Sequence, residues 1–160
     1  MGRFIFLSMG LLVVALSLSG AGADHHCPPS WSSFNEFCFK LFKQWETWND
    51  AEMSCRQAQN SSHLASIHSW AESFHVGRLL SRHFILNNVW IGLSDPQKNL
   101  TWEWSDGSEV SFTRWNSDPN NLRNKGNCVQ LSKFSGYRQW NAVNCGSRHF
   151  FICKIQPESE

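Results

Sequence analysis

The run Val89-Trp90-Ile91-Gly92-Leu93 (V-W-I-G-L) predicts a buried β-strand, because nearly all of its side chains are apolar and aromatic or β-branched residues favour strands. Beyond it the sequence breaks into short strand signals at 102–104, 128–131 and 150–154, separated by loops. A further stretch with strand signals, from Cys27 to Phe42, opens the domain. Helix signals lie between that opening and Val89, so we expect an α+β domain.

Two capping patterns predict the two helices. Thr47 is suited to cap a helix that begins near Trp48, and Ser69 with Glu72 forms a capping box for a helix that runs to about Arg82. The residues spaced to face inward are Ala51, Cys55 and Ala58 in the first helix, and Trp70, Phe74 and Gly77 in the second.

The amino-terminal residues have the pattern of a targeting segment. Arg3 precedes an apolar run from Phe4 to Leu18, and Ala21-Gly22-Ala23 is a small-residue cleavage site. The apolar run is shorter than the ~20 residues that a membrane span needs, and no later stretch is apolar enough to span a bilayer. We therefore expect residues 1–23 to be a signal peptide, residues 24–160 to form one domain, and the product to be secreted.

Export makes the six cysteines a disulfide framework rather than metal ligands. Six cysteines allow 15 pairings, and their spacing does not choose among them. The count is even, so no thiol need be left for a second chain; we expect no interchain disulfide and either a monomer or a non-covalent oligomer. Asn60 and Asn99 begin Asn-x-Ser/Thr triplets and are candidate glycosylation sites.

The charges are balanced in number but not in distribution. The chain has 14 Lys and Arg against 13 Asp and Glu, yet no acid lies between Asp118 and Glu158. Two interpretations stay open: a solvated surface whose charges interleave after folding, or a basic face for an anionic partner such as a sulfated glycan or an acidic protein. Secretion and the lack of a Lys/Arg-rich motif argue against nucleic acid. The basic residues of this stretch are Arg123, Lys125, Lys133, Arg138, Arg148 and Lys154.

The region from Ser105 to Asn127 has few strand signals and is therefore predicted to be a long loop. Long loops in compact domains are usually functional or disordered, so this region is the expected binding segment. It contains Asp118-Pro119-Asn120 and many side-chain amides, but it also carries Arg123 and Lys125 where a metal site would need acids.

Three motifs together resemble those of C-type lectin domains. They are Trp90-Ile91-Gly92-Leu93, then Trp102-x-Trp104-Ser105-Asp106-Gly107, then Trp140-Asn141 shortly before Cys145. The resemblance covers Cys27 to Lys154, and the leader and length are similar to those of reptile venom C-type lectins. It implies a fold of two helices and short antiparallel strands with a long ligand-binding loop, and core positions for Trp90, Trp102 and Trp104. It also implies the disulfides Cys27–Cys38, Cys55–Cys153 and Cys128–Cys145.

The resemblance further implies a mannose-type calcium site that has lost ligands. Its remaining members are Asp118, Asn120 and Asn141, whereas Gly126 and Ala142 stand where sugar-binding relatives have acids. At the supplementary calcium position Asp95 matches, and Asn99, Asn121 and Asn127 stand where acids are usual. Calcium needs 6–8 oxygen ligands, several of them carboxylates, so we expect calcium binding to be weak or absent. Acids introduced at Gly126 and Ala142 are then expected to restore it.

Two functions follow from these observations. The first is recognition of cell-surface glycans through the Asp118-Pro119-Asn120 element, with weakened or lost dependence on calcium. The alternative is a lectin-like toxin that has abandoned sugar and binds a haemostatic blood protein or platelet receptor. An enzyme is not expected, because the sequence has no H-E-x-x-H zinc motif and no G-x-S-x-G nucleophile motif.

Overall fold

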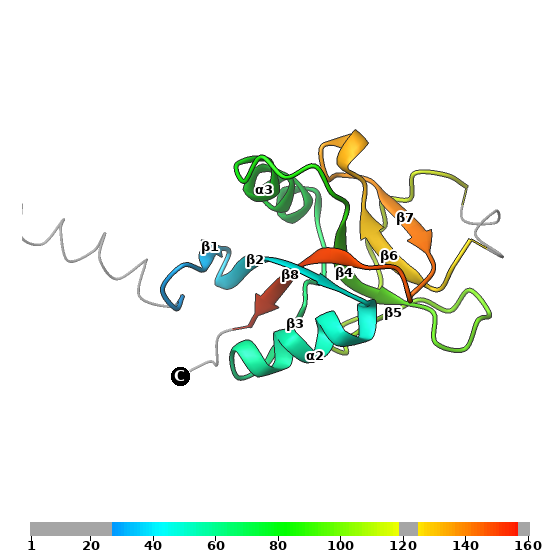
Figure 1. Ribbon diagram of the computed structural model, residues 1–160, viewed down its shortest axis with the longest axis horizontal. Coiled ribbons are helices and arrows are strands. Elements are labelled where there is room, and N and C mark those ends of the chain that lie inside the picture. Colours follow the sequence, from blue (N-terminus) through cyan, green and yellow to red (C-terminus); the bar gives the residue numbers. More distant parts are fainter. Residues whose placement is uncertain (1–26, 119–124, 157–160) are drawn as a thin grey trace, which may run out of the picture.

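The computed structural model describes residues 27–118 and 125–156. In these residues the strands form one eight-stranded sheet in the order β1-β2-β8-β4-β6-β7, with β3 on β8 and β5 on β4 (Figure 1). The predicted signal peptide lies outside the described residues. The strands are β1 Ser32–Phe34, β2 Phe37–Glu46, β3 Ser62–Leu64, β4 Val89–Ser94, β5 Glu103–Trp104, β6 Cys128–Leu131, β7 Trp140–Val143 and β8 His149–Ile155; the helices are α2 Trp48–Ala58, α3 Trp70–Ser81 and the short 3-10 helix η2 Lys133–Ser135.

The predicted α+β fold is confirmed, with one refinement to the sheet. Most neighbouring strands are antiparallel, but β4 runs parallel to β8, with Val89 opposite Phe150 and Trp90 opposite Phe151. Parallel neighbours need a long connection, which residues 95–148 provide here. This long connection contains the loop in which we expected the binding site.

Both predicted helix caps are present. The Thr47 hydroxyl accepts the Asp50 N–H at 3.3 Å, and the Ser69 hydroxyl accepts the Glu72 N–H at 3.1 Å. Each bond satisfies one of the free N–H groups at a helix start. These local contacts explain why the sequence alone located both helices.

The predicted orientation of α3 is wrong for its two aromatic residues. Trp70 is 66% exposed and Phe74 is 49% exposed, whereas Val76, Gly77 and Leu80 are buried. A Cβ on Gly77 would lie 3.0 Å from the Gly136 carbonyl oxygen, so the helix meets its neighbour through its smallest residue. Close backbone packing on that side leaves the large aromatic rings on the outside.

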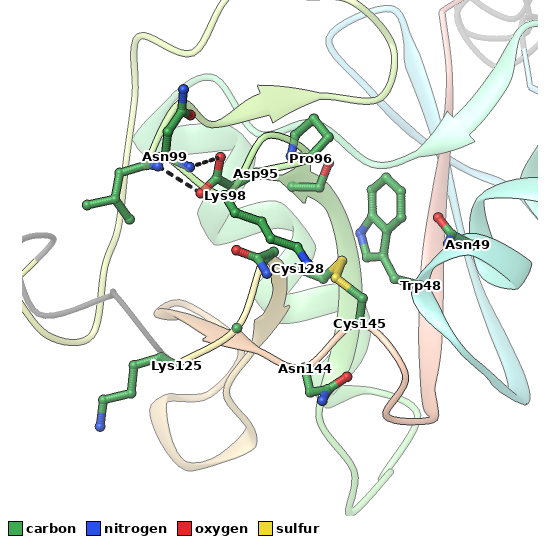
Figure 2. Close-up of a pocket in the computed structure, with 14 residues that line it drawn as sticks. Trp48, Asn49, Asp95, Pro96, Lys98, Asn99, Lys125, Cys128, Asn144 and Cys145 are labelled. Carbon is green, nitrogen blue, oxygen red and sulfur yellow. Dashed lines mark hydrogen bonds between the residues drawn. A yellow bond between two sulfur atoms is a disulfide. The ribbon is translucent and has the colours of Figure 1, made fainter.

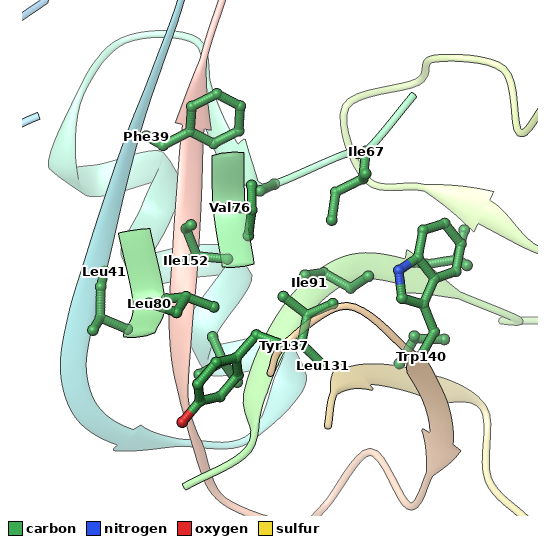
Figure 3. Packing of buried hydrophobic residues seen from close by; sticks show 14 of the residues in the cluster. Phe39, Leu41, Ile67, Val76, Leu80, Ile91, Leu131, Tyr137, Trp140 and Ile152 are labelled. Atoms are coloured by element: carbon green, nitrogen blue, oxygen red, sulfur yellow. The ribbon is translucent and has the colours of Figure 1, made fainter. Parts of the chain in front are cut away.

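The core contains the tryptophans that the motifs predicted to be buried. Trp90 is fully buried, Trp104 is almost fully buried, and Trp102 is partly buried against the main cluster. The Trp90 Nε1–H donates to the Glu46 carbonyl at 2.9 Å, which satisfies the indole in the interior. Figure 3 shows part of the main cluster, where side chains of α3 meet those of the sheet.

The three disulfides have the implied pairing, Cys27–Cys38, Cys55–Cys153 and Cys128–Cys145. The second ties α2 to β8, and the third joins the first residue of β6 to the turn after β7. All six cysteines are therefore used within the chain. Among the described residues no helix is long and apolar enough to cross a membrane.

Candidate functional site

Asp95, the predicted supplementary calcium ligand, holds the turn after β4. Its side chain is buried, and its two carboxylate oxygens accept the backbone N–H groups of Asn99 at 3.3 Å and Leu100 at 2.8 Å. Its own N–H donates to the Asn127 carbonyl at 2.8 Å, which fastens the turn to the end of the long loop. Asp95 thus anchors the turn, and each of its carboxylate oxygens already accepts one backbone N–H.

A pocket of about 950 Å³ lies beside this turn (Figure 2). It is formed by the start of α2, the turn after β4, the end of the long loop and the turn that contains Cys145. Figure 2 shows the Lys98 side chain extending across it toward the Cys128–Cys145 disulfide, and Lys125 at its rim. We refer to this space as the Lys98 pocket. Its other polar side chains include the amides of Asn49, Asn99, Asn127 and Asn144.

There is no space for a side chain at Gly126, the position at which the family resemblance implies an acid in sugar-binding relatives. Its φ is +140°, and a Cβ there would lie 1.9 Å from the Val143 carbonyl carbon and 2.1 Å from its oxygen. The end of the long loop therefore presses directly on the backbone at the end of β7. No side chain fits at Gly126 unless one of the two segments moves.

The other replaced position lies in the sheet. Ala142 is 7% exposed and is opposite Val129 in the β6–β7 ladder, whereas Asn141 is partly exposed and opposite Gln130. Asn141 and Ala142 point to opposite faces of β7, as adjacent residues in a strand do. Ala142 thus packs at a largely buried position of the β6–β7 ladder.

The long loop reaches β7 before the described residues break off. The Trp140 N–H donates to the Arg114 carbonyl at 2.8 Å, and the Asn116 N–H donates to the Trp140 carbonyl at 3.0 Å. Asp118 follows as an exposed residue, while Asn120, Asn121 and Arg123 lie outside the described residues. The mannose-type role of the Asp118-Pro119-Asn120 element therefore stays a prediction.

The described residues supply few carboxylate ligands for a calcium ion. No group of three His, Cys, Asp or Glu side chains within residues 27–118 and 125–156 could hold a metal. Asp95 already accepts two backbone N–H groups, Gly126 has no room for a side chain, and Ala142 has no oxygen in its side chain. The Lys98 ammonium adds positive charge to the space where a cation would have to enter.

A second polar group, which the sequence did not reveal, lies under the Ser105-Asp106-Gly107 turn. The buried Lys154 ammonium donates to both oxygens of Glu72, at 3.1 and 3.2 Å, and to the Ser66 hydroxyl at 3.2 Å. The Ser66 hydroxyl donates to Asp106 at 2.5 Å, so the motif turn is tied to the interior. Burial lowers the pKa of Lys154, although the Glu72 carboxylate opposes that shift.

This group contains Ser, His and Asp side chains but not in a catalytic order. The Ser66 hydroxyl contacts both the His68 ring, at 3.1 Å, and Asp106, so no histidine lies between serine and acid. Burial would raise the pKa of Asp106, but hydrogen bonds from Ser108 and Ser66 bring it below its usual value. The arrangement therefore holds the turn in place.

Both candidate glycosylation sites are exposed. Asn60 follows α2, and Asn99 is on the rim of the Lys98 pocket. The Asn99 side-chain oxygen accepts the Thr101 N–H at 3.1 Å, which shapes the turn that carries it. The residues that could have indicated the Lys98 pocket from the sequence are Lys98 and Lys125, together with its four asparagines.

Comparisons with known proteins agree with this fold. Residues 44–155 match the family described as Lectin C-type domain. The C-type lectin lectoxin-Lei1 of the snake Leioheterodon madagascariensis is 58% identical, over 97% of this chain and 100% of the relative. Human lithostathine is 36% identical with a TM-score of 0.77, over 81% of this chain and 98% of its own. A calcium-independent type II antifreeze protein is 29% identical with a TM-score of 0.71, over 84% and 99%.

The fold, the three disulfides and the family match over most of the sequence lead to one conclusion. The chain belongs to the C-type lectin family, in which the snake venom lectoxins resemble it over nearly its whole length.

Proposed function

We propose that this protein is a secreted lectin that binds acidic glycans in the Lys98 pocket without a calcium ion. The observation that carries the proposal is the Lys98 side chain, which extends across the pocket beside a closed ligand position at Gly126. An ammonium group in this place repels a metal cation and attracts a carboxylate or sulfate. The predicted signal peptide, the three disulfides and the lectoxin relatives support secretion.

The pocket has the donors that such a ligand needs. Lys98 and Lys125 supply positive charge, and the amides of Asn49 and Asn144 can donate to and accept from sugar hydroxyls. Its single acid, Asp95, is buried and already bonded to the backbone. The size lies within the range of small-ligand sites. The calcium-independent antifreeze protein has the same fold, which supports a working domain without the metal.

The test is binding to a glycan array that includes sulfated, carboxylated and neutral glycans, with and without a chelator. We expect acidic glycans to bind equally in both conditions. Titration with a sulfated disaccharide should then show a loss of about fivefold for Lys98→Gln, which corresponds to roughly 1 kcal/mol for one ion pair. Lys43→Gln, at an exposed position on β2, is the matched control and should bind normally. Selective binding of neutral glycans, or binding lost with chelator, would contradict the proposal.

The alternative, a blood or platelet protein as the target, has separate support. Large aromatic side chains are exposed on α3, away from the residues that line the Lys98 pocket. Such side chains are common in protein interfaces.

A further inference from the structure

The exposed side of α3 carries two aromatic rings one helical turn apart. Trp70 and Phe74 are at positions i and i+4, so they lie on the same face of the helix. Both are largely exposed, and a tryptophan this accessible is unusual in a folded domain. The Trp70 ring also meets the edge of Phe112, with ring centroids 5.6 Å apart, which fixes its position.

Each ring is covered by an arginine from another part of the chain. The Arg114 guanidinium lies 3.7 Å from the Trp70 ring centroid, and the Arg138 guanidinium lies 4.5 Å from that of Phe74. An arginine held over a ring interacts with it through its charge, and its guanidinium has several N–H groups that can donate hydrogen bonds to another partner. The two pairs therefore present planar donor groups in fixed positions beside apolar surface.

The framework places both arginines. The Arg114 carbonyl accepts the Trp140 N–H at the start of β7, and the Arg138 N–H donates to the Ser135 hydroxyl at 3.2 Å. Gly77 lets the segment that carries Arg138 approach α3, since a Cβ there would lie 3.5 Å from the Arg138 Cγ. The arginine positions thus depend on backbone contacts, and they do not require a ligand to form.

The segment that contains α3 has almost no acid to balance the charge of these arginines. In the sequence between Ile67 and Ser94 the sole acid is Glu72, which is buried and bound to Lys154. Among the described residues neither Arg114 nor Arg138 forms a salt bridge, while Arg78 and Arg82 add exposed positive charge at the end of α3. The surface is therefore both apolar and strongly basic.

The same character continues onto the neighbouring turn. Figure 1 shows η2 on the same side of the sheet as α3, and there Phe134 is exposed with the Lys133 ammonium 5.0 Å from its ring centroid. The segment after α3 joins this turn through a bond from the Lys133 N–H to the Asn88 side chain at 2.9 Å. Exposed aromatic and basic side chains thus extend beyond the two stacked pairs.

We propose that the surface made by Trp70, Phe74, Arg114 and Arg138 binds an acidic segment of a partner protein. Carboxylates would pair with the guanidinium edges, and apolar side chains of the partner would cover the two rings. Tryptophan and arginine dominate the binding energy of protein interfaces, whereas a sulfated sugar chain would use the charge and leave most of the apolar area exposed. This surface shares no residue with the Lys98 pocket, so it is a second site.

The experiment selects peptides from a random display library against the folded protein and measures the affinity of the selected peptides by titration calorimetry. We expect the selected peptides to be rich in Asp and Glu with interspersed apolar residues. Arg114→Gln and Trp70→Ala should each weaken peptide binding at least tenfold. Arg114→Gln should also reduce the salt dependence of peptide binding, because it removes a positive charge. Trp45→Ala, which removes another exposed tryptophan on β2, and Lys98→Gln should leave the peptide affinity unchanged.

Thermal unfolding of each variant shows whether it remains folded. Peptides without acidic enrichment, or acidic peptides that bind the Arg114→Gln and Trp70→Ala variants normally, would overturn the proposal. It would also be overturned if a heparin oligosaccharide competed with the peptides and lost binding to the same variants, because the surface would then be a site for sulfated glycans.

Discussion

Gly126 and Val143 are in direct backbone contact: a Cβ on Gly126 would lie 1.9 Å from the Val143 carbonyl carbon. The backbone at the end of the long loop therefore packs against the backbone at the end of β7, with no space for a side chain between them. An acid introduced at Gly126 cannot reach a metal site without separating them. The contact argues against restoring calcium binding with acids at Gly126 and Ala142, which stays a prediction.

The contact predicts an unusually large effect of a single methyl group. Gly126→Ala combines a backbone clash with a φ of +140° that L-residues rarely adopt, so we expect a loss of more than about 3 kcal/mol in the free energy of unfolding. Gly136→Ala is the control, because its φ is +67° and a Cβ there meets nothing within 4 Å. It should cost only about 1 kcal/mol. Urea unfolding measures both, and equal losses would mean that the Gly126 contact is not tight.

The buried pair of Lys154 and Glu72 predicts a second large effect. Lys154→Met leaves the Glu72 carboxylate without its main partner in the interior, and breaking such a pair costs about 3–5 kcal/mol. Arg56→Met is the control, since it removes an ion pair with Glu52 that involves an exposed arginine and should cost no more than about 1 kcal/mol. Chemical denaturation of the two variants tests the difference. A Lys154→Met protein as stable as the control would show that the pair adds nothing.

Three histidines predict a loss of stability in mild acid. Burial is the main cause that lowers the pKa of His68, His75 and His149 below 6.5, and the positive charge of Lys154 adds to the shift at His68. Between pH 6.5 and the lower folded values the unfolded chain binds more protons. The stabilisation is therefore complete above about pH 6.5 and falls as the pH drops, by up to about 1.4 kcal/mol per pH unit for each histidine.

Urea unfolding between about pH 7.5 and 5.5 measures this slope, above the range in which carboxylates dominate. Replacement of all three histidines by glutamine should flatten the profile. A wild-type profile that is flat over this window would show that these rings accept protons in the folded state as readily as in the unfolded chain.

The position of Asn99 predicts that a glycan there blocks the Lys98 pocket. Thr101→Ala removes the glycosylation triplet but keeps the Asn99 side chain at the rim. In protein made by glycosylating cells, this change should strengthen binding of the sulfated disaccharide, and Asn60→Gln should not. In protein made by bacteria the Thr101→Ala change should have no effect. If mass spectrometry verifies a glycan on Asn99 and the proteins from both sources bind the sulfated disaccharide equally well, the glycan does not block the pocket.

The sequence predicted those features that depend on neighbouring residues. The caps at Thr47 and Ser69 are contacts three residues apart, and the buried strand at Val89 needs only its own apolar side chains. The disulfide pairing came from the resemblance, since the sequence alone left every pairing open. These predictions are confirmed by the structure.

Features that depend on contacts between distant segments were missed. The spacing of Trp70 and Phe74 showed that they share a helix face, but the contact of Gly77 with Gly136 decides which face is buried. The contact of Gly126 with Val143 was missed, because it joins two segments that the sequence does not place together. The Lys98 pocket has the same origin, since its walls come from four separate parts of the chain.

We propose that this domain binds its ligand without calcium, and calcium titration calorimetry on the folded protein shows whether the domain binds the ion at all. Extracellular calcium modules bind the ion with dissociation constants of about 10⁻⁴–10⁻³ M. Because Asp95 is held by backbone donors and Gly126 is closed, we predict no saturable heat up to millimolar calcium. A saturable isotherm that disappears in the presence of chelator would contradict the account.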